Sequence, residues 1–308
     1  MIPSEKEEQL IFFRNVFIFF GCWLGGSILG MAMMQLVSGF FGITDWNHLI
    51  EKIKEGAYPE HINTIKIISI SGHFFSYTFT AVLFATIIYK KNNFRFLYLN
   101  TFPQLKSFLL IILIFIFAYP LAIWVAYFNT LIIPKHFIAT DVLAFENRLM
   151  QMNSAFDLVL NIILFGVIAG IGEELIFRGI IQKYIAQYFK NGHFAVWTTA
   201  FFFSMIHFQP EGFIARFLMG ALLGYVFVWT GSLWASISGH VTFNSLQVLL
   251  FYIVGDTKEV ANTYQKPDFP VWLSIIFAGI FIFVVFLLQK INSKNFLNSN
   301  NYCSELAE

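Results

Sequence analysis

The sequence predicts an all-α membrane protein, a polytopic bundle of about eight transmembrane helices. Hydrophobic residues make up 57% of the 308 residues and charged residues only 12%, whereas soluble domains carry about 25% charged residues. Several apolar runs approach the roughly 20 residues that a helix needs to cross the hydrocarbon core. A transmembrane β-barrel would instead show alternating segments of about ten residues.

The apolar runs, taken in chain order, give the expected spans. The fifth run is the shortest, and we expect it to be tilted or to cross the membrane incompletely. The longest link, residues 129–155, still contains apolar residues and is expected to hold a short amphipathic helix. The expected spans cover residues 16–41, 66–89, 107–128, 156–176, 194–209, 213–230, 233–254 and 270–289.

The charges of the links predict the orientation. The link 90–106 and the segment after the fourth span contain basic residues and no acid, whereas 43–65 and 255–269 mix both signs. Cytoplasmic links carry an excess of Lys and Arg. With eight spans, we therefore expect both termini in the cytoplasm. The basic residues that decide this are Lys90, Lys91, Arg95, Lys106, Arg178, Lys183, Lys190, Lys290 and Lys294.

Small residues recur four positions apart within the spans, a spacing that favours close contact between helices. The simplest interpretation is packing within the chain, although the same spacing would serve contacts between copies, so the oligomeric state stays open. A formal net charge of +1 argues against nucleic acid as a partner. The pairs are Gly21/Gly25, Gly26/Gly30, Gly166/Gly170 and Gly220/Gly224.

Two adjacent carboxylates, Glu173 and Glu174, directly follow the apolar run of the fourth span. A charge at the bilayer centre costs about 2.5–3.5 kcal/mol on insertion scales, so such carboxylates are usually functional. Glu174 and Arg178 stand one helical turn apart and can form an ion pair, which is the structural interpretation of Glu174. Glu173 is rotated by about 100° and faces small residues, where another helix or a water molecule can approach.

Two histidines and an asparagine add polar groups to later apolar segments. His207, taken alone, is more often a hydrogen-bonded histidine between helices than a catalytic one. His240 and Asn244 share one face of the seventh span, and Ser236 extends that face. The structural interpretation of this stripe is hydrogen bonding between helices. Three further histidines are expected at the membrane interfaces: His73, His136 and His193.

Together, a carboxylate, two histidines and an amide could hydrolyse an amide bond. The carboxylate can take a proton from water, the histidines can hold a metal or hydrogen-bond water and substrate, and the amide can donate to an oxyanion. Two His and one Glu are also a ligand set of catalytic zinc. The spacing, however, is not the His-Glu-x-x-His of zincins. The groups would have to converge from three different helices.

These residues resemble the three signature motifs of the CAAX protease and bacteriocin-processing (CPBP, or Abi) family of intramembrane proteases. The motifs are Glu173-Glu174-x-x-x-Arg178, Phe203-x-x-x-His207 and His240-x-x-x-Asn244. The resemblance implies that Glu173 activates water, with Glu174 and Arg178 supporting it. It also implies that His207 and His240 complete the site and that Asn244 stabilises the oxyanion.

The resemblance leaves the need for a metal open. Many members are described as metalloproteases, and a glutamate-activated water without a metal has also been argued. If a metal is used, the expected ion is zinc (Zn2+) and the expected ligands are Glu173, His207 and His240. The expected substrate is a membrane-associated peptide or protein, and the bilayer is the other partner. The expected location is a bacterial plasma membrane.

Four regions follow from the spans and the resemblance. Residues 1–15 are an expected cytoplasmic segment, and 16–150 hold the N-terminal transmembrane helices. Residues 151–255 form the expected protease-like core. Residues 256–308 hold the last transmembrane helix and a cytoplasmic tail.

Two other functions compete with an intramembrane endopeptidase. A proton-coupled transporter could use the Glu and His side chains as a relay. Transporters often show inverted repeats and broken helices, and neither is visible in this sequence. A non-catalytic membrane scaffold could keep the polar cluster for packing alone.

Overall fold

A computed structural model describes residues 5–55, 61–138, 140–254 and 266–293. All regular structure in these ranges is helical, which confirms the predicted all-α class. The expected N-terminal residues 1–4, part of the link 255–269 and the tail from residue 294 onward lie outside the described residues.

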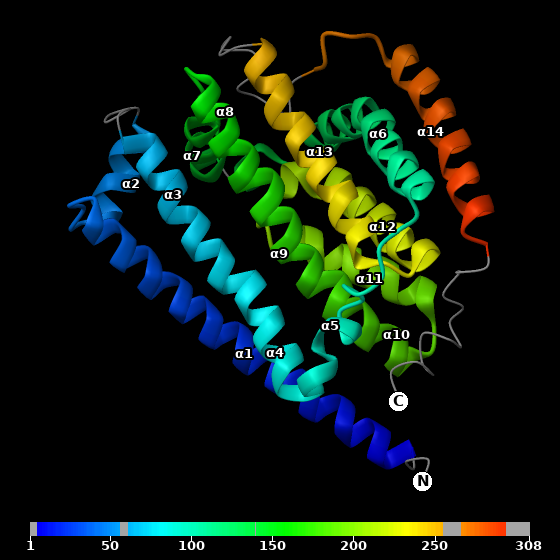
Figure 1. The fold of residues 1–308 in the computed structure, drawn as a ribbon. Coiled ribbons are helices and arrows are strands. Elements are labelled where there is room, and N and C mark those ends of the chain that lie inside the picture. Colours follow the sequence, from blue (N-terminus) through cyan, green and yellow to red (C-terminus); the bar gives the residue numbers. More distant parts are fainter. Residues whose placement is uncertain (1–4, 56–60, 139, 255–265, 294–308) are drawn as a thin grey trace.

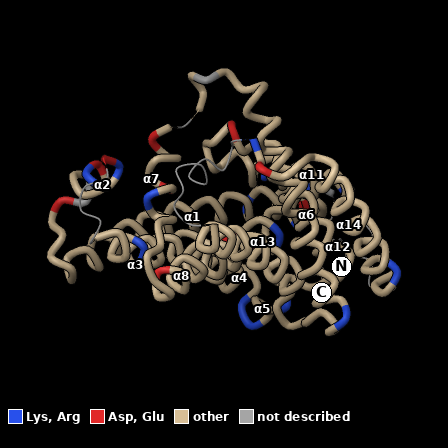
Figure 2. Tube along the Cα trace, turned by 90° about the horizontal axis from the view of Figure 1, so that it is seen from above, with Lys and Arg blue, Asp and Glu red and all other residues tan. Residues whose placement is uncertain are grey.

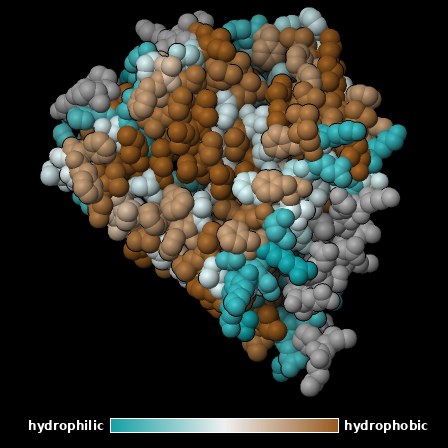
Figure 3. All heavy atoms as spheres, viewed as in Figure 1, coloured by the Kyte–Doolittle hydropathy of each residue, from teal (hydrophilic) through white to brown (hydrophobic). Residues whose placement is uncertain are grey.

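Seven of the described helices are long and apolar enough to cross a membrane, so the chain is a multi-pass integral membrane protein. Exposed apolar side chains cover the outside of the bundle, as a lipid-facing surface requires. In Figure 3 the visible face is brown across its middle, and teal residues gather toward its lower end. The candidate spans are Lys6–Phe40, Ile62–Phe96, Leu105–Ile132, Ala155–Phe189, Pro210–Thr230, Leu233–Val254 and Val271–Ile291.

The helices that make up these spans follow the order of the chain. Several spans are divided by π-helical turns, and α2 and α7 are short helices between spans. The elements are α1 (Glu5–Phe40), α2 (Trp46–Lys54), α3 (Ile62–His73), η2 (Phe74–Phe79), α4 (Thr80–Tyr89), η3 (Lys90–Asn92), α5 (Asn93–Phe96), α6 (Leu105–Ile132), η4 (Lys135–Phe137), α7 (Thr140–Met150), α8 (Ala155–Asn161), η5 (Ile162–Ile168), α9 (Ala169–Ile176), η6 (Phe177–Gln182), α10 (Lys183–Phe189), α11 (Gly192–Met205), η7 (Pro210–Gly212), α12 (Phe213–Thr230), α13 (Leu233–Val254) and α14 (Val271–Ile291).

The fifth expected span, residues 194–209, is the one that the structure shortens. It is α11, a helix of 14 residues, which is about 21 Å long at 1.5 Å per residue. That falls short of the roughly 30 Å hydrocarbon core. The helix α11 packs against α12, and its other face is exposed at residues such as Phe194, Trp197 and Met205. The turn between them, residues 206–212, therefore carries His207 into the bundle.

The helix with the two glutamates lies at the centre (Figure 1). The helix α9 packs against η2 on one side and α13 on the other. The helices α1, α3 and α4 form one flank, while α6 and α14 form the other. The start of α1 and the end of α14 lie at the same end of the molecule, together with α5 and α10. Seen from above in Figure 2, most of the tube is tan and charges gather at short elements such as α2 and α5.

Small residues let three helix pairs approach closely. A side chain at Gly170 would meet Val241 of α13, and one at Gly220 would meet Ala200 of α11. Gly26 and Gly30 lie against η2 and the end of α3. The predicted packing role is thus confirmed for three of the four glycine pairs. It is wrong for Gly21/Gly25, whose missing side chains would meet nothing within 4 Å.

Candidate active site

The two carboxylates lie on α9, in the continuous helix Ala155–Phe189. π-helical turns lie on either side of them, η5 before and η6 after. Each such turn widens the helix locally and shifts the face on which later residues lie, and π-helical turns are frequent at functional sites. The apolar side chains Leu175, Ile176 and Phe177 anchor this helix in the largest buried cluster of the described residues.

Glu174 is fully buried, and its carboxylate accepts three hydrogen bonds, one from its own continuous helix and two from α13. Arg178 Nη1 donates to Oε1 at 2.6 Å, and His240 Nδ1 donates to the same oxygen at 2.8 Å. Ser236 Oγ donates to Oε2 at 2.5 Å. A carboxylate with three donors is well stabilised in a water-free interior. Glu174 is therefore occupied in holding neighbouring side chains.

Arg178 is also fully buried, and its charge is compensated on several sides. Besides Glu174, it binds the carbonyl oxygen of Gly220 through Nη2 at 2.6 Å. Its guanidinium lies over the ring of Phe203, 4.8 Å from the ring centroid. Partners of this kind offset the large desolvation cost of a buried cation.

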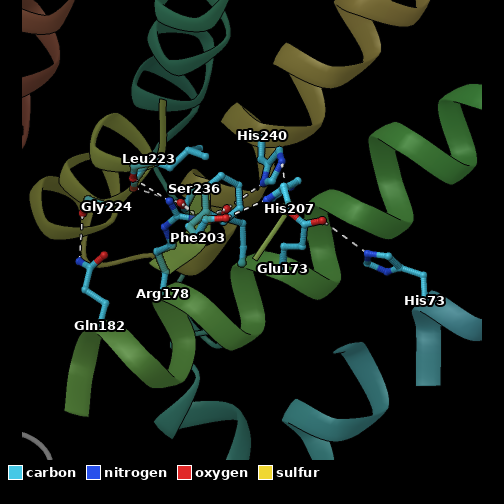
Figure 4. A network of polar contacts seen from close by, with 12 residues as sticks. His73, Glu173, Arg178, Gln182, Phe203, His207, Leu223, Gly224, Ser236 and His240 are labelled. Atoms are coloured by element: carbon cyan, nitrogen blue, oxygen red, sulfur yellow. Dashed lines mark hydrogen bonds and ion pairs between the residues drawn. The ribbon is translucent and has the colours of Figure 1, made fainter. Parts of the chain in front are cut away.

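Glu173 has a different environment, with histidines on two sides (Figure 4). Its Oε1 lies 3.5 Å from Nε2 of His73, and its Oε2 lies 3.9 Å from Nε2 of His240. Its side chain is 11% exposed, whereas that of Glu174 is completely enclosed. The two neighbouring glutamates thus differ in contact and access: one is held tightly, and the other has looser contacts and some space.

His207 lies in the turn directly after α11. Its Nδ1 is 2.8 Å from the carbonyl oxygen of Phe203, which can only accept, so Nδ1 carries the proton and Nε2 is left to face the cluster. The ring of Phe203 contacts both histidines, with centroids 5.2 Å from His207 and 5.8 Å from His240. Phe203 therefore links His207, His240 and Arg178.

The turn that carries His207 is fixed by polar contacts from two other elements. Nε2 of Gln209 donates to Glu146 of α7 at 2.8 Å, and Oε1 of Gln209 accepts from Arg216 of α12 at 2.9 Å. Asn129 of α6 donates to the carbonyl oxygens of Pro210 and Glu211 at 2.7 and 2.6 Å. The position of His207 thus depends on α6 and α7 as well as on its own hairpin.

Asn244 lies one turn after His240 on α13. Its Nδ2 donates to the carbonyl oxygen of Phe165 in η5 at 2.9 Å. One of its two amide protons is therefore directed at the backbone of η5, and only the other is left for a substrate.

The structure brings most of the predicted site residues together. Glu173, Glu174, Arg178 and His240 form a connected cluster, and Phe203 joins His207 to it. Asn244 is on the adjacent turn of α13, in contact with the backbone of η5.

Sequence reasoning missed two members of the cluster. The bond from Ser236 to Glu174 was not predicted, although Ser236 was recognised on the polar face of the seventh span. The interfacial location expected for His73 is wrong, because it lies within the span Ile62–Phe96 and against Glu173. The available signal was a histidine in an apolar helix, the same signal that singled out His207 and His240.

The expected zinc ligands do not form a metal centre in this arrangement. Among the described residues, no group of three or more His, Cys, Asp and Glu side chains is placed to hold a metal ion. The Nδ1 atoms of His240 and His207 are bound to Glu174 and to a carbonyl oxygen, which leaves both Nε2 atoms available as ligands, so the spacing of the ligands decides the fit. Two ligands of one tetrahedral zinc lie about 3.3 Å apart, closer than the 3.9 Å between His240 Nε2 and Glu173 Oε2. We therefore derive the chemistry from the side chains alone.

Comparison with known proteins supports the assignment of the motifs. The uncharacterized protein YpbD of Bacillus subtilis (strain 168) is 27% identical over 90 residues, which cover 28% of this chain and 43% of YpbD. The matched part is thus less than half of that relative. No solved structure matches the chain. Residues 155–246 match the family described as Type II CAAX prenyl endopeptidase Rce1-like. The matched residues extend from α8 to the middle of α13 and contain all three motifs, so this part of the chain is similar to the Rce1-like family of type II CAAX prenyl endopeptidases.

Proposed function

We propose that this protein is an intramembrane endopeptidase in which Glu173 activates the attacking water. The observation that carries the proposal is the difference between the two glutamates. Glu174 accepts three hydrogen bonds of 2.8 Å or less, whereas histidine nitrogens approach Glu173 at 3.5 and 3.9 Å. A carboxylate that is near histidines and partly accessible is suited to general-base catalysis.

His240 supports this role through its tautomer. Because Nδ1 donates to Glu174, a neutral His240 presents the lone pair of Nε2 toward Glu173. Two acceptors 3.9 Å apart suit a bridging water that donates one hydrogen to each. In the proposed reaction, Glu174 and Arg178 act indirectly, by holding His240 in this orientation.

The proposed reaction consumes one water for each peptide bond. Glu173 takes a proton from the water while the water oxygen bonds to the carbonyl carbon. The second amide proton of Asn244 stabilises the negative charge on the carbonyl oxygen. His207 belongs to the same cluster of side chains. The carbon–nitrogen bond then breaks, and Glu173 returns its proton to the leaving nitrogen. Charges and atoms balance without another reactant.

The proposed substrate is a membrane-associated peptide or protein, cut near the cytoplasmic face. The matching family is described as a CAAX prenyl endopeptidase, and an S-farnesylated C-a-a-X peptide is therefore the first probe. Support for the orientation comes from the basic elements α5 and α10, which lie at the end where α1 starts and α14 ends. We infer that this end faces the cytoplasm of a bacterial cell, with both termini there.

We further propose that residues 151–255 form the catalytic core, as the match over residues 155–246 suggests. Residues 16–150 and the last span surround it. The proton-coupled transporter remains the competing function, because it would use the same Glu and His side chains.

The test uses purified full-length protein in detergent micelles. The probe is a farnesylated C-a-a-X peptide with a fluorophore and a quencher on either side of the bond after the cysteine. An unprenylated amphipathic peptide accompanies it. We expect cleavage by the wild type and a loss of at least about 100-fold in kcat for Glu173→Gln. The matched control is Glu51→Gln, on the exposed face of α2. Equal cleavage by wild type and Glu173→Gln contradicts the proposal, and proton-linked uptake into proteoliposomes would then favour the transporter.

A further inference from the structure

His73 is the last residue of α3, where the helix continues into the π-helical turn η2. It comes from the N-terminal helices, outside the matched residues 155–246. Its Nε2 lies 3.5 Å from Oε1 of Glu173, and Figure 4 shows its ring reaching toward that carboxylate from the opposite side to His240. Glu173 is therefore the point where the N-terminal helices meet the helices that carry the three motifs of the candidate site.

The ring of His73 is held in a fixed orientation by stacking. It lies 4.3 Å from the ring of Tyr77, and the two planes differ by only 10°. The ring of Trp23 in α1 packs edge-on against Tyr77, with the ring centroids 6.4 Å apart. Aromatic rings in stacked and edge-on arrangements attract one another in addition to burying apolar area. The stack thus restricts the directions in which His73 can point.

A glycine next to the catalytic carboxylate allows this approach. A side chain at Gly172 would lie 2.8 Å from Cβ of Tyr77 and 3.2 Å from Cε1 of His73. Contacts below 3.0 Å are not tolerated, so α9 and η2 can meet at this distance only because residue 172 lacks a side chain. His73 is consequently packed against α9 at the level of Glu173.

The polar contact of His73 is with the carboxylate. A carboxylate can only accept, so Nε2 carries the proton and donates toward Oε1. The other ring nitrogen, Nδ1, is buried and has no hydrogen-bond partner among the described residues. The orientation of the ring is therefore set by its stacking on Tyr77 and by its contact with Glu173. Ionisable residues within membrane spans are usually functional, and the polar partner of this histidine is Glu173.

We propose that His73 is a positioning residue for Glu173, supplied by the N-terminal helices. By holding Oε1, it directs Oε2 toward His240 and toward the space where the proposed water is activated. The inference rests on the proposed function of Glu173. It adds that the matched residues 155–246 do not contain the whole site. His73, stacked on Tyr77, lies against Oε1 of Glu173, and His240 lies against Oε2.

The test compares kcat and KM of three variants on the farnesylated peptide. We expect His73→Ala to lower kcat by roughly 10- to 100-fold with little change in KM, because misplacement of a catalytic group by about 1 Å costs up to about 100-fold. His73→Gln places an amide N–H near the position of Nε2 and should recover most of the loss. The control, His193→Ala, removes a histidine whose Nδ1 contacts Tyr225, away from the site, and should cleave like the wild type.

The outcomes separate this inference from the proposed function. If Glu173→Gln is inactive and His73→Ala keeps the wild-type kcat, the positioning role is wrong and the function stands. If His73→Ala and His73→Gln lose activity equally while both unfold at the wild-type temperature, donation from Nε2 is not what matters, and the inference fails. If Glu173→Gln cleaves like the wild type, the proposed function itself fails.

A second measurement needs no substrate. We expect the shifts in unfolding temperature caused by His73→Gln and Glu173→Gln to be non-additive in the double variant, because contacting residues couple energetically. Additive shifts would mean that the two side chains do not interact, and would contradict the proposal. This measurement also shows whether His73 and Glu173 interact if His73→Ala fails to fold or if the wild type cleaves neither peptide.

Discussion

Oε1 of Glu174 accepts a 2.8 Å hydrogen bond from Nδ1 of His240, which joins the glutamate helix α9 to α13. The bond also determines which ring nitrogen of His240 is protonated. Glu174 is too enclosed to contact a substrate. Through this bond it nevertheless affects the reaction that we propose for Glu173. The first two predictions test this bond and its supports.

We expect Glu174→Gln to destabilise the protein strongly. The change leaves the buried Arg178 without a counter-charge, and breaking a buried pair in this way costs roughly 3–5 kcal/mol. Thermal and denaturant unfolding in detergent measure the loss. The matched control is Glu55→Gln, which removes an exposed pair with Lys52 at 2.8 Å and should change little. Similar effects of the two substitutions would show that the buried pair contributes no more than the exposed one.

Ser236→Ala tests the second support of Glu174. The hydroxyl donates to Oε2 at 2.5 Å and is fully buried. A hydrogen bond to a charged group contributes about 1.5–3 kcal/mol, so we expect a loss of that order and a smaller fall in kcat than for Glu173→Gln. Ser238→Ala, which removes a hydroxyl bonded to a carbonyl oxygen of its own helix, is the control. A loss no larger than that of the control would exclude Ser236 as a support.

Contacts within one helix could be predicted from the sequence, whereas contacts between helices could not. The Glu174–Arg178 pair follows from a spacing of four residues. The bonds from Ser236 and His240 to Glu174 do not, because they depend on which helix α13 packs against. His73 is further removed, since a hundred residues of chain separate it from Glu173. Only the packing of η2 against α9 brings the two together.

The π-helical turns of the glutamate helix, and the contacts that hold the turn after α11, have no clear signal in the sequence. The π-helical turns η5 and η6 shift the faces of the glutamate helix, so a regular helix gives only an approximate direction for Glu173. The shortness of α11 was partly anticipated from its apolar length. The contacts that hold its turn, from Glu146 to Gln209 and from Asn129 to Pro210, come from distant segments.

The turn that carries His207 predicts a pH dependence of stability. Burial raises the pKa of the Glu146 carboxyl in α7 above its ordinary value, although the bond from Gln209 and the charge of Arg216 act against the shift. A raised folded-state pKa means that the folded protein binds the proton more tightly than the unfolded chain. The stabilising contribution is thus fully present below the unfolded pKa and is lost as the pH rises through the folded value.

We therefore expect stability to fall from about pH 4 toward pH 7 by an amount that Glu146→Gln removes. Unfolding temperatures of both proteins across this range measure the difference. Glu51→Gln on the exposed face of α2 controls for the general effect of removing a carboxylate. Parallel curves for the wild type and Glu146→Gln would mean that Glu146 does not titrate differently on folding.

Gly172→Ala tests the close approach that brings His73 to Glu173. The added methyl would lie 2.8 Å from Cβ of Tyr77, on a rigid aromatic residue rather than at the end of a flexible side chain. Overpacking of this kind costs about 1–3 kcal/mol, and relief requires η2 to move away from α9.

Such a movement would withdraw His73 from the carboxylate of Glu173. We therefore expect Gly172→Ala to lower kcat as His73→Ala does, although it removes no polar group. The matched control is Gly21→Ala in α1, where the methyl meets nothing within 4 Å. Alanine favours a helix over glycine by about 1 kcal/mol, so this variant should be at least as stable as the wild type. If Gly172→Ala is destabilised but keeps the wild-type kcat, the spacing of α9 and η2 matters for folding and not for the orientation of Glu173.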